Sequence, residues 1–115
     1  MKKPVFVSAQ DAAAMIGDGK TVATIGMTLV SASETILKAI EKRFLETGSP
    51  NQLTLVHSCG QSDRDRGIQH FSHDGMLKCI IGGHWGLQPR MMKMIAENKM
   101  LAYCLPQGQF AQLYR

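Results

Sequence analysis

The residues of this chain that could do chemistry gather after its apolar runs, where strands are expected to end. The clearest case is Pro106-Gln107-Gly108, which follows the apolar run Met100 to Cys104. Proline cannot continue regular strand pairing, and glycine lets the backbone turn sharply. We therefore expect the Gln107 amide to be displayed at the carboxyl end of a strand. In open α/β sheets, ligands bind at that end.

Three further loops carry polar or glycine-rich residues in the corresponding position. They are Gly26-Met27-Thr28, His57-Ser58-Cys59-Gly60 and Gly82-Gly83-His84-Trp85. The carboxyl ends of parallel strands meet at one edge of a sheet, so we expect all four loops to form a single rim that holds the ligand. In this carboxyl rim, His84 and Trp85 either shape the pocket, with the indole as a flat apolar wall, or serve as packed loop anchors.

Two other kinds of chemistry fit these residues less well. Cys59 with His57 or His84 as its base would make a nucleophile, but a lone cysteine with scattered histidines is a loose pattern. A metal module would draw on soft ligands in the loops, namely His57, Cys59, His70, His73 and His84. Structural zinc sites use four ligands with paired spacing, which this sequence lacks, so we predict no metal site.

Apolar runs and turn residues predict strands that alternate with helices. The predicted strands are Thr21 to Ile25, Leu53 to His57, Leu77 to Ile81 and Met100 to Cys104. The predicted helices are Ala12 to Ile16, Ser33 to Thr47, a short piece from Ile68 to His73, Gln88 to Asn98, and one that starts at Gln109. This alternation predicts an α/β fold, with an open, mainly parallel sheet and helices on both faces.

The helix from Ser33 to Thr47 carries three of the chain's four glutamates. Ser31-x-x-Glu34 has the spacing of a capping box, so we interpret Glu34 as a helix cap. Glu41 and Glu46 fall on the face opposite the apolar positions, where we expect water. The fourth, Glu97, lies near the end of a later helix, and we name none of the four as catalytic.

Size and composition limit the class of protein. With 115 residues, the chain forms at most one domain, residues 1 to 115. Its net charge is +4, but the 13 Lys and Arg residues are spread along the chain, which argues against a nucleic-acid partner. Three cysteines without C-x-x-C spacing indicate reduced thiols and a cytoplasmic location. No stretch approaches the roughly 20 apolar residues that span a bilayer, so we expect no membrane partner.

Four fragments in order give the chain a family resemblance. They are Asp63-Arg-x-Arg-Gly67, Gly83-His84-Trp85-Gly86-x-x-Pro89-Arg90, Asn98-Lys99-x-x-Ala102-Tyr103 and Pro106-Gln107-Gly108. Together they resemble the amino-terminal part of a family I coenzyme A transferase of the acetate/propionate branch. The resemblance runs from about Ser8 to the last residue and implies the fold of the amino-terminal part of a CoA-transferase domain.

Enzymes of this family move coenzyme A from an acyl-CoA to a free carboxylic acid, through an acyl anhydride and a glutamyl-CoA thioester. The resemblance makes acyl-CoA and a short-chain acid the substrates, with no other cofactor. The family's nucleophilic glutamate lies in a carboxyl-terminal motif that nothing here matches. We therefore expect an inactive, truncated piece whose partners are the missing carboxyl-terminal half and, through its exposed apolar faces, further copies of itself.

The resemblance also implies roles for individual residues. Gln107 matches the glutamine that donates a hydrogen bond to the developing oxyanion, and Gly108 lies beside it. The pocket would be lined by Gly26, Met27, Thr28, Ser58, Cys59, Gly60, His84, Trp85 and Gly108. The alternative interpretation is a non-catalytic domain that binds CoA or a nucleotide.

Overall fold

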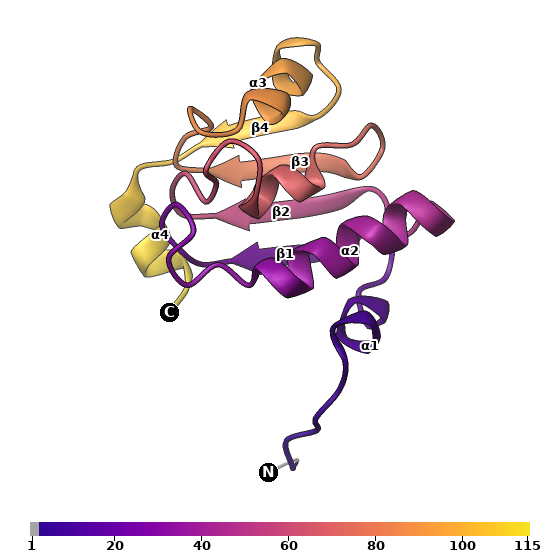
Figure 1. The fold of residues 1–115 in the computed structure, drawn as a ribbon. Coiled ribbons are helices and arrows are strands. Elements are labelled where there is room, and N and C mark those ends of the chain that lie inside the picture. Colours follow the sequence, from indigo (N-terminus) through magenta and orange to yellow (C-terminus); the bar gives the residue numbers. More distant parts are fainter. Residues whose placement is uncertain (1–2) are drawn as a thin grey trace.

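The computed structural model describes residues 3–115, which form one four-stranded parallel sheet (Figure 1). The strands lie side by side in chain order: β1 (Thr21–Thr24), β2 (Leu53–His57), β3 (Leu77–Gly82) and β4 (Leu101–Cys104). All three neighbouring pairs are parallel. The predicted open parallel α/β sheet is confirmed, and each strand matches its predicted range to within one residue at either end.

One helix precedes the first strand, and each strand is then followed by a helix, as the predicted alternation requires. They are α1 (Ala9–Ala14), α2 (Glu34–Thr47), the 3-10 helix η1 (Gly67–Phe71), α3 (Pro89–Ala96) and α4 (Gln107–Leu113). α1 begins before its predicted start because Ser8 is its N-cap, with Oγ accepting a hydrogen bond from the Asp11 amide. Among residues 3–115, no helix is long and apolar enough to cross a membrane.

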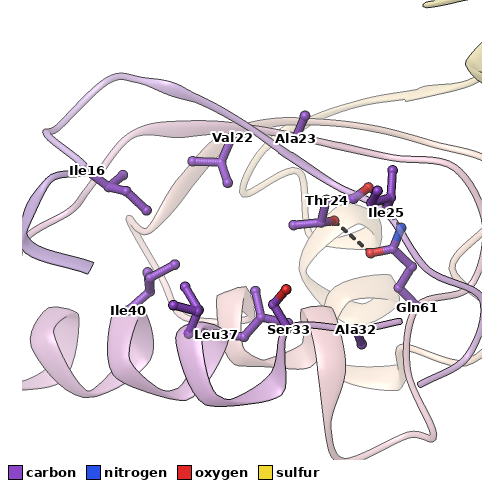
Figure 2. Close-up of a pocket in the computed structure, with 11 residues that line it drawn as sticks. Ile16, Val22, Ala23, Thr24, Ile25, Ala32, Ser33, Leu37, Ile40 and Gln61 are labelled. Atoms are coloured by element: carbon purple, nitrogen blue, oxygen red, sulfur yellow. Dashed lines mark hydrogen bonds between the residues drawn. The ribbon is translucent and has the colours of Figure 1, made fainter. Parts of the chain in front are cut away.

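A groove of about 210 Å³ lies between β1 and α2, at the edge of the sheet (Figure 2). One end is apolar, with Ile16 and Ile40 facing each other across it. At the other end, toward the carboxyl rim, Thr24 and Gln61 are joined by a hydrogen bond. The groove therefore changes from apolar to polar along the length of β1.

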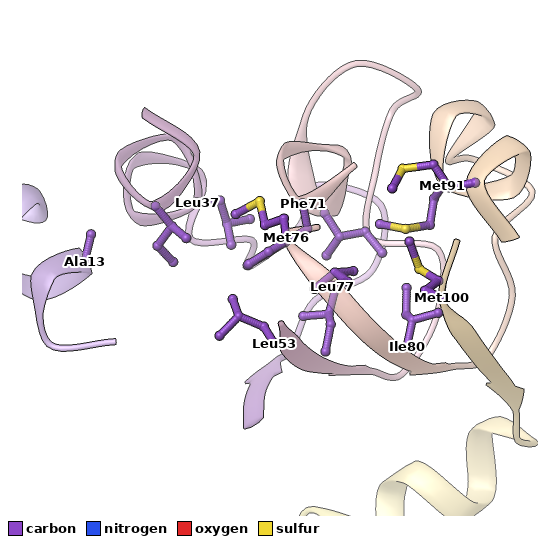
Figure 3. Packing of buried hydrophobic residues seen from close by; sticks show 13 residues of the cluster. Ala13, Leu37, Leu53, Phe71, Met76, Leu77, Ile80, Met91 and Met100 are labelled. Carbon is purple, nitrogen blue, oxygen red and sulfur yellow. The ribbon is translucent and has the colours of Figure 1, made fainter. Parts of the chain in front are cut away.

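The main core lies between the sheet and one layer of helices. Figure 3 shows Leu53, Leu77 and Ile80 of the sheet below Phe71 of η1 and Met91 of α3. A sheet that grows in one direction through right-handed crossovers places its crossover helices on one face, as α2, η1 and α3 are placed. The helix α4 lies on the opposite side of the sheet.

The second face of the sheet is mostly open. Leu101 and Tyr103 of β4 are 62% and 54% exposed, and Ile25, directly after β1, is 65% exposed. The prediction of helices on both faces therefore holds only through α4. The exposed apolar side chains mark a surface on which other polypeptide could pack.

Two local predictions on α2 are wrong. Its N-cap is Ser33, which makes no side-chain cap bond, while Ser31 lies in a turn with a φ of 63°. Because Ser31 is outside the cap position, the predicted capping box does not form. Glu34 instead accepts a hydrogen bond from the Gly67 amide of η1, 2.9 Å away.

Glu41 is not on a solvated face. Its carboxylate contacts the Nδ1 of His70 at 2.5 Å and the Nε2 of His73 at 2.6 Å. Glu34 contacts the other nitrogen of His70 at 2.8 Å. Burial raises the pKa of both carboxyls, but the hydrogen bonds from the imidazoles outweigh it and hold each pKa below its usual value. These contacts attach α2 to η1.

Candidate active-site rim

The loop after β1 is a tight turn pinned to its neighbour. The Met27 amide donates to the Val30 carbonyl at 3.1 Å, and the Val30 amide donates back at 2.9 Å. Gly26 has a φ of 145°, and a Cβ there would lie 2.8 Å from the Val30 carbonyl oxygen, so the turn requires glycine. The Thr28 amide donates to the Gly60 carbonyl at 2.9 Å. The amides of Met27, Thr28 and Val30 therefore already have partners inside the protein.

The loop after β2 is organised by His57, which is fully buried. The indole N–H of Trp85 donates to His57 Nε2 at 3.0 Å, so the ring proton lies on Nδ1 and is donated to the Cys59 carbonyl at 2.8 Å. Burial lowers the pKa of His57 to about 4, although the bond to the Cys59 carbonyl acts in the opposite direction. His57 is therefore a neutral structural group at neutral pH.

The hypothesis of a cysteine nucleophile is wrong for this geometry. The Cys59 thiol is buried and donates to the Gly26 carbonyl at 3.1 Å, while both nitrogens of His57 have other partners.

His84 accepts from the Gly60 amide at 3.1 Å and lies 3.2 Å from the Gly86 amide. A neutral imidazole has one acceptor nitrogen, so only one of these two bonds forms at a time.

Two glycines at the end of β3, Gly82 and Gly83, let the loops approach each other closely. A Cβ on Gly82 would lie 2.1 Å from His57 Nε2, and one on Gly83 would lie 2.1 Å from the Ser58 carbonyl oxygen. Neither distance is compatible with a side chain, so the two glycines are required by packing. His84 and Trp85 hold the same loops by hydrogen bonds, which favours the loop-anchor interpretation of both residues.

The fourth loop presents Gln107 as expected, but from within a helix. The helix α4 begins at Gln107, two residues earlier than predicted, with Pro106 as its N-cap. The Gln107 side chain is exposed and makes no hydrogen bond among residues 3–115, and Gly108 has open space around it. The preceding strand end is fixed, because the Leu105 amide donates to the Gly82 carbonyl at 3.0 Å. The Gln107 amide is therefore free for a ligand, on a fixed base.

The structure adds Gln61, which the sequence did not single out. Its side chain is 1% exposed, accepts from the Thr24 hydroxyl at 2.7 Å and donates to the Thr24 carbonyl at 2.9 Å. The same carbonyl accepts from the Tyr114 hydroxyl at 3.1 Å. Gln61 thus joins the second loop to β1 at the polar end of the groove. A glutamine in a polar loop gives no sequence signal of such burial.

The five residues considered as metal ligands do not converge. His57, Cys59 and His84 lie in the carboxyl rim, whereas His70 and His73 bind the carboxylates of α2. In the described part of the chain, no three His, Cys, Asp or Glu side chains are placed to hold a metal ion.

The fold defines a class of protein, the open parallel α/β domains, and proteins of this class bind ligands at the carboxyl ends of their strands. No family model matches the chain. The chain is 33% identical over 111 residues to acetate CoA-transferase YdiF of Escherichia coli K12, and this match covers 95% of this chain and 21% of that protein. It is 36% identical over 111 residues to caffeate CoA-transferase of Acetobacterium woodii, covering 96% of this chain and 21% of that protein.

Solved structures give the same result. The apoenzyme of E. coli O157:H7 YdiF superposes with a TM-score of 0.85 at 32% identity, over 97% of this chain and 23% of that one. A YdiF thioester complex with CoA superposes with a TM-score of 0.81 at 34% identity, over 89% of this chain and 20% of that chain. The chain is therefore homologous to one segment of these CoA-transferases, and it spans about a fifth of the length of the curated relatives it matches.

Proposed function

We propose that this chain forms one wall of a CoA-transferase active site, which moves coenzyme A from a short-chain acyl-CoA to a free acid such as acetate or propionate. The observation that carries the proposal is the free, exposed amide of Gln107 at the carboxyl rim. Acetate CoA-transferase YdiF and caffeate CoA-transferase act on different acids by name, so the choice of acid is the finer part of the proposal.

Gln107 would act on the thioester carbonyl. When a carboxylate attacks the carbonyl carbon, the carbonyl oxygen gains negative charge. The Gln107 side-chain N–H would donate a hydrogen bond to that oxygen. The amide is neutral, and the helix start that carries it is fixed to the sheet, so only the side chain itself has to reorient. One such donor typically contributes about 3–4 kcal/mol to transition-state stabilisation.

The nucleophile would come from polypeptide outside this chain. Each glutamate here already has a partner: Glu34 and Glu41 bind histidines, Glu46 lies 3.8 Å from Lys42, and Glu97 lies 3.2 Å from Lys99. None of them matches the family's glutamate motif. We therefore propose that the 115-residue chain alone binds but does not transfer, in a cytoplasmic enzyme that uses CoA thioesters and no other cofactor.

Two assays test these proposals. The first supplies acetyl-CoA and propionate to the purified chain and follows propionyl-CoA by mass spectrometry. We expect no product, and turnover at an enzymatic rate would refute the missing nucleophile.

The second assay tests Gln107 in a complete site. This chain replaces the matching segment of E. coli YdiF, and Gln107→Ala is compared with Gln109→Ala, an exposed glutamine of the same helix. We expect Gln107→Ala to lower kcat about 10²–10³-fold and Gln109→Ala to leave it within about twofold. Equal effects of both variants would refute the oxyanion role. Acyl-CoA binding without transfer by the unmodified chimera would favour the non-catalytic binding domain.

A further inference from the structure

The imidazole of His84 lies between two backbone amides, and each amide points at one of its ring nitrogens. The Gly60 amide lies 3.1 Å from Nε2, and the Gly86 amide lies 3.2 Å from Nδ1. A neutral imidazole carries a lone pair on one nitrogen and a hydrogen on the other. One of the two amides therefore faces a ring N–H instead of an acceptor.

Burial decides which amide keeps the lone pair. Gly60 is buried, and its amide has no other acceptor among residues 3–115, whereas Gly86 is exposed and its amide can donate to water. A buried N–H without an acceptor costs more than an exposed one, so Nε2 accepts from Gly60 and the ring hydrogen is on Nδ1. The Nδ1–H of His84 and the N–H of Gly86 are then two donors 3.2 Å apart. No side chain of residues 3–115 supplies an acceptor to this donor pair.

The loop that carries the donor pair is held in place on both sides of Gly86. The indole N–H of Trp85 donates to His57 Nε2 at 3.0 Å. A Cβ on Gly60 would lie 2.5 Å from His84 Cε1, so the ring packs directly against the Gly60 backbone. The donor pair is therefore in place before a ligand arrives, and only the exposed Gly86 peptide has to turn toward that ligand.

Two neutral N–H groups select a ligand oxygen that only accepts hydrogen bonds. An ionised carboxylate has two such oxygens and a single negative charge. Phosphate carries more charge and is typically bound through Arg or Lys, neither of which takes part in this pair. We propose that the Nδ1–H of His84 and the N–H of Gly86 bind the carboxylate of a small organic acid at the carboxyl end of β3.

This carboxylate site is on the same rim as Gln107. β3 and β4 are neighbouring parallel strands (Figure 1), and the Leu105 amide at the end of β4 donates to the Gly82 carbonyl at 3.0 Å. An acid bound at His84 would thus share the rim with the thioester that Gln107 contacts. The identification of this acid as the one that receives coenzyme A rests on the proposed function, whereas carboxylate binding itself does not.

NMR of the isotope-labelled 115-residue chain tests the tautomer and the binding together. At pH 8, where an ordinary imidazole is neutral, long-range proton–nitrogen correlation should show a hydrogen on His84 Nδ1 and none on Nε2. Acetate is then titrated against sodium chloride at constant ionic strength. We expect saturable shifts of the Gly86 amide and of His84 Nδ1, with a dissociation constant on the order of millimolar. The Gly60 amide should stay unchanged.

Two variants of His84 separate its donor from its acceptor. His84→Gln puts an amide oxygen near the Nε2 position, so Gly60 keeps an acceptor, but no donor remains at Nδ1. This variant should unfold at the parent's temperature and bind acetate at least about 10-fold more weakly. His84→Asn puts an amide N–H near the Nδ1 position and leaves Gly60 without its acceptor. It should unfold at a lower temperature and, where folded, bind acetate within about threefold of the parent.

Three NMR results would overturn the proposal. The first is a hydrogen on His84 Nε2 instead of Nδ1, and the second is a set of Gly86 shifts that sodium chloride alone reproduces. The third is acetate binding by His84→Gln as tight as in the parent chain, which a purely structural anchor would give. Inorganic phosphate is a further probe. If phosphate bound at least about 10-fold more tightly than acetate, the site would fit a phosphoryl group such as those of coenzyme A, and the carboxylate assignment would be wrong.

The YdiF chimera described above tests the link to catalysis. There His84→Gln should raise the KM for propionate about 10-fold and leave the KM for acetyl-CoA within about twofold. Equal changes in both KM values would contradict the assignment of the bound acid as substrate. Since the NMR readouts need no CoA transfer, a chimera that binds acetate at His84 without transferring coenzyme A would refute the proposed function and leave the carboxylate site standing.

Discussion

Protonation of one buried imidazole should make this fold less stable as the pH falls from 7 to 5. His57 is fully buried and binds the Cys59 carbonyl through Nδ1 and the Trp85 indole through Nε2. A proton on Nε2 would place two donors against each other, in a position with no solvent. Burial accordingly lowers the pKa of this imidazole from 6.5 to about 4 in the folded state.

The sign and size of the effect follow from this difference. Because the folded state holds the proton more weakly than the unfolded state, lowering the pH favours unfolding, from about pH 6.5 down to about pH 4. Between pH 7 and pH 5 the loss is about 2 kcal/mol, and it approaches about 3 kcal/mol below pH 4. The folded-state pKa values of Glu34 and Glu41 lie below 4.5, so the stability that these carboxylates contribute is lost mainly below the range from pH 7 to pH 5.

Urea unfolding of the chain at pH 7, 6 and 5 measures the loss directly. The control is His57→Asn, which cannot ionise and keeps a short amide near the Cys59 carbonyl. This variant should be about 1–3 kcal/mol less stable at pH 7, since the buried Trp85 indole loses its acceptor. Its decline from pH 7 to 5 should be smaller than that of the parent chain by about 2 kcal/mol. Parallel declines in the two proteins would refute the role assigned to His57.

Two further substitutions test packing and the contact between α2 and η1. In thermal unfolding, Gly82→Ala should destabilise the chain by about 1–3 kcal/mol, because the new Cβ would lie 2.1 Å from His57 Nε2. The control is Gly108→Ala, which should be neutral or slightly stabilising because no atom lies within 4 Å of its Cβ position. In urea unfolding at pH 7, Glu41→Gln should lower the free energy of unfolding by about 1.5–3 kcal/mol, because it replaces a charged acceptor of two histidines. Its control, Glu46→Gln, removes one member of an exposed ion pair and should cost less than about 0.5 kcal/mol. A loss for Gly108→Ala as large as that for Gly82→Ala, or equal losses for the two glutamate variants, would contradict these assignments.

The strands were predictable because their signal is local. Each is a short apolar run between turn residues, such as Leu53 to His57 after Gly48-Ser49-Pro50-Asn51. Alternation with helices then requires parallel pairing, which places all four following loops on one edge. The position of the rim thus follows from the sequence without any tertiary information.

The contacts of Glu34 and Glu41 were not predictable in the same way. Helical periodicity shows which face points away from the sheet, and both residues fall outside the apolar stripe. It does not show that η1, about 30 residues later, packs along the margin of that stripe and brings His70 to both carboxylates. A partner distant in the sequence leaves no periodic signal, so the residues look solvated when they are not.

The interior contacts of the loop after β1 were not predictable either. Its glycine and its position before a helix do not show which partners the loop amides take. The structure shows that the glycine is required by the turn itself and that the Thr28 amide is bound to Gly60. The rim loops mostly bind one another, through Cys59 to Gly26 and Trp85 to His57, and the end of β4 is tied to this frame by Cys104 to Gly83 at 3.0 Å. Rigid neighbours of this kind fix the backbone from which the Gln107 side chain extends. In the proposed site, the glycines and histidines of this frame would contribute by holding the backbone of Gln107 in position.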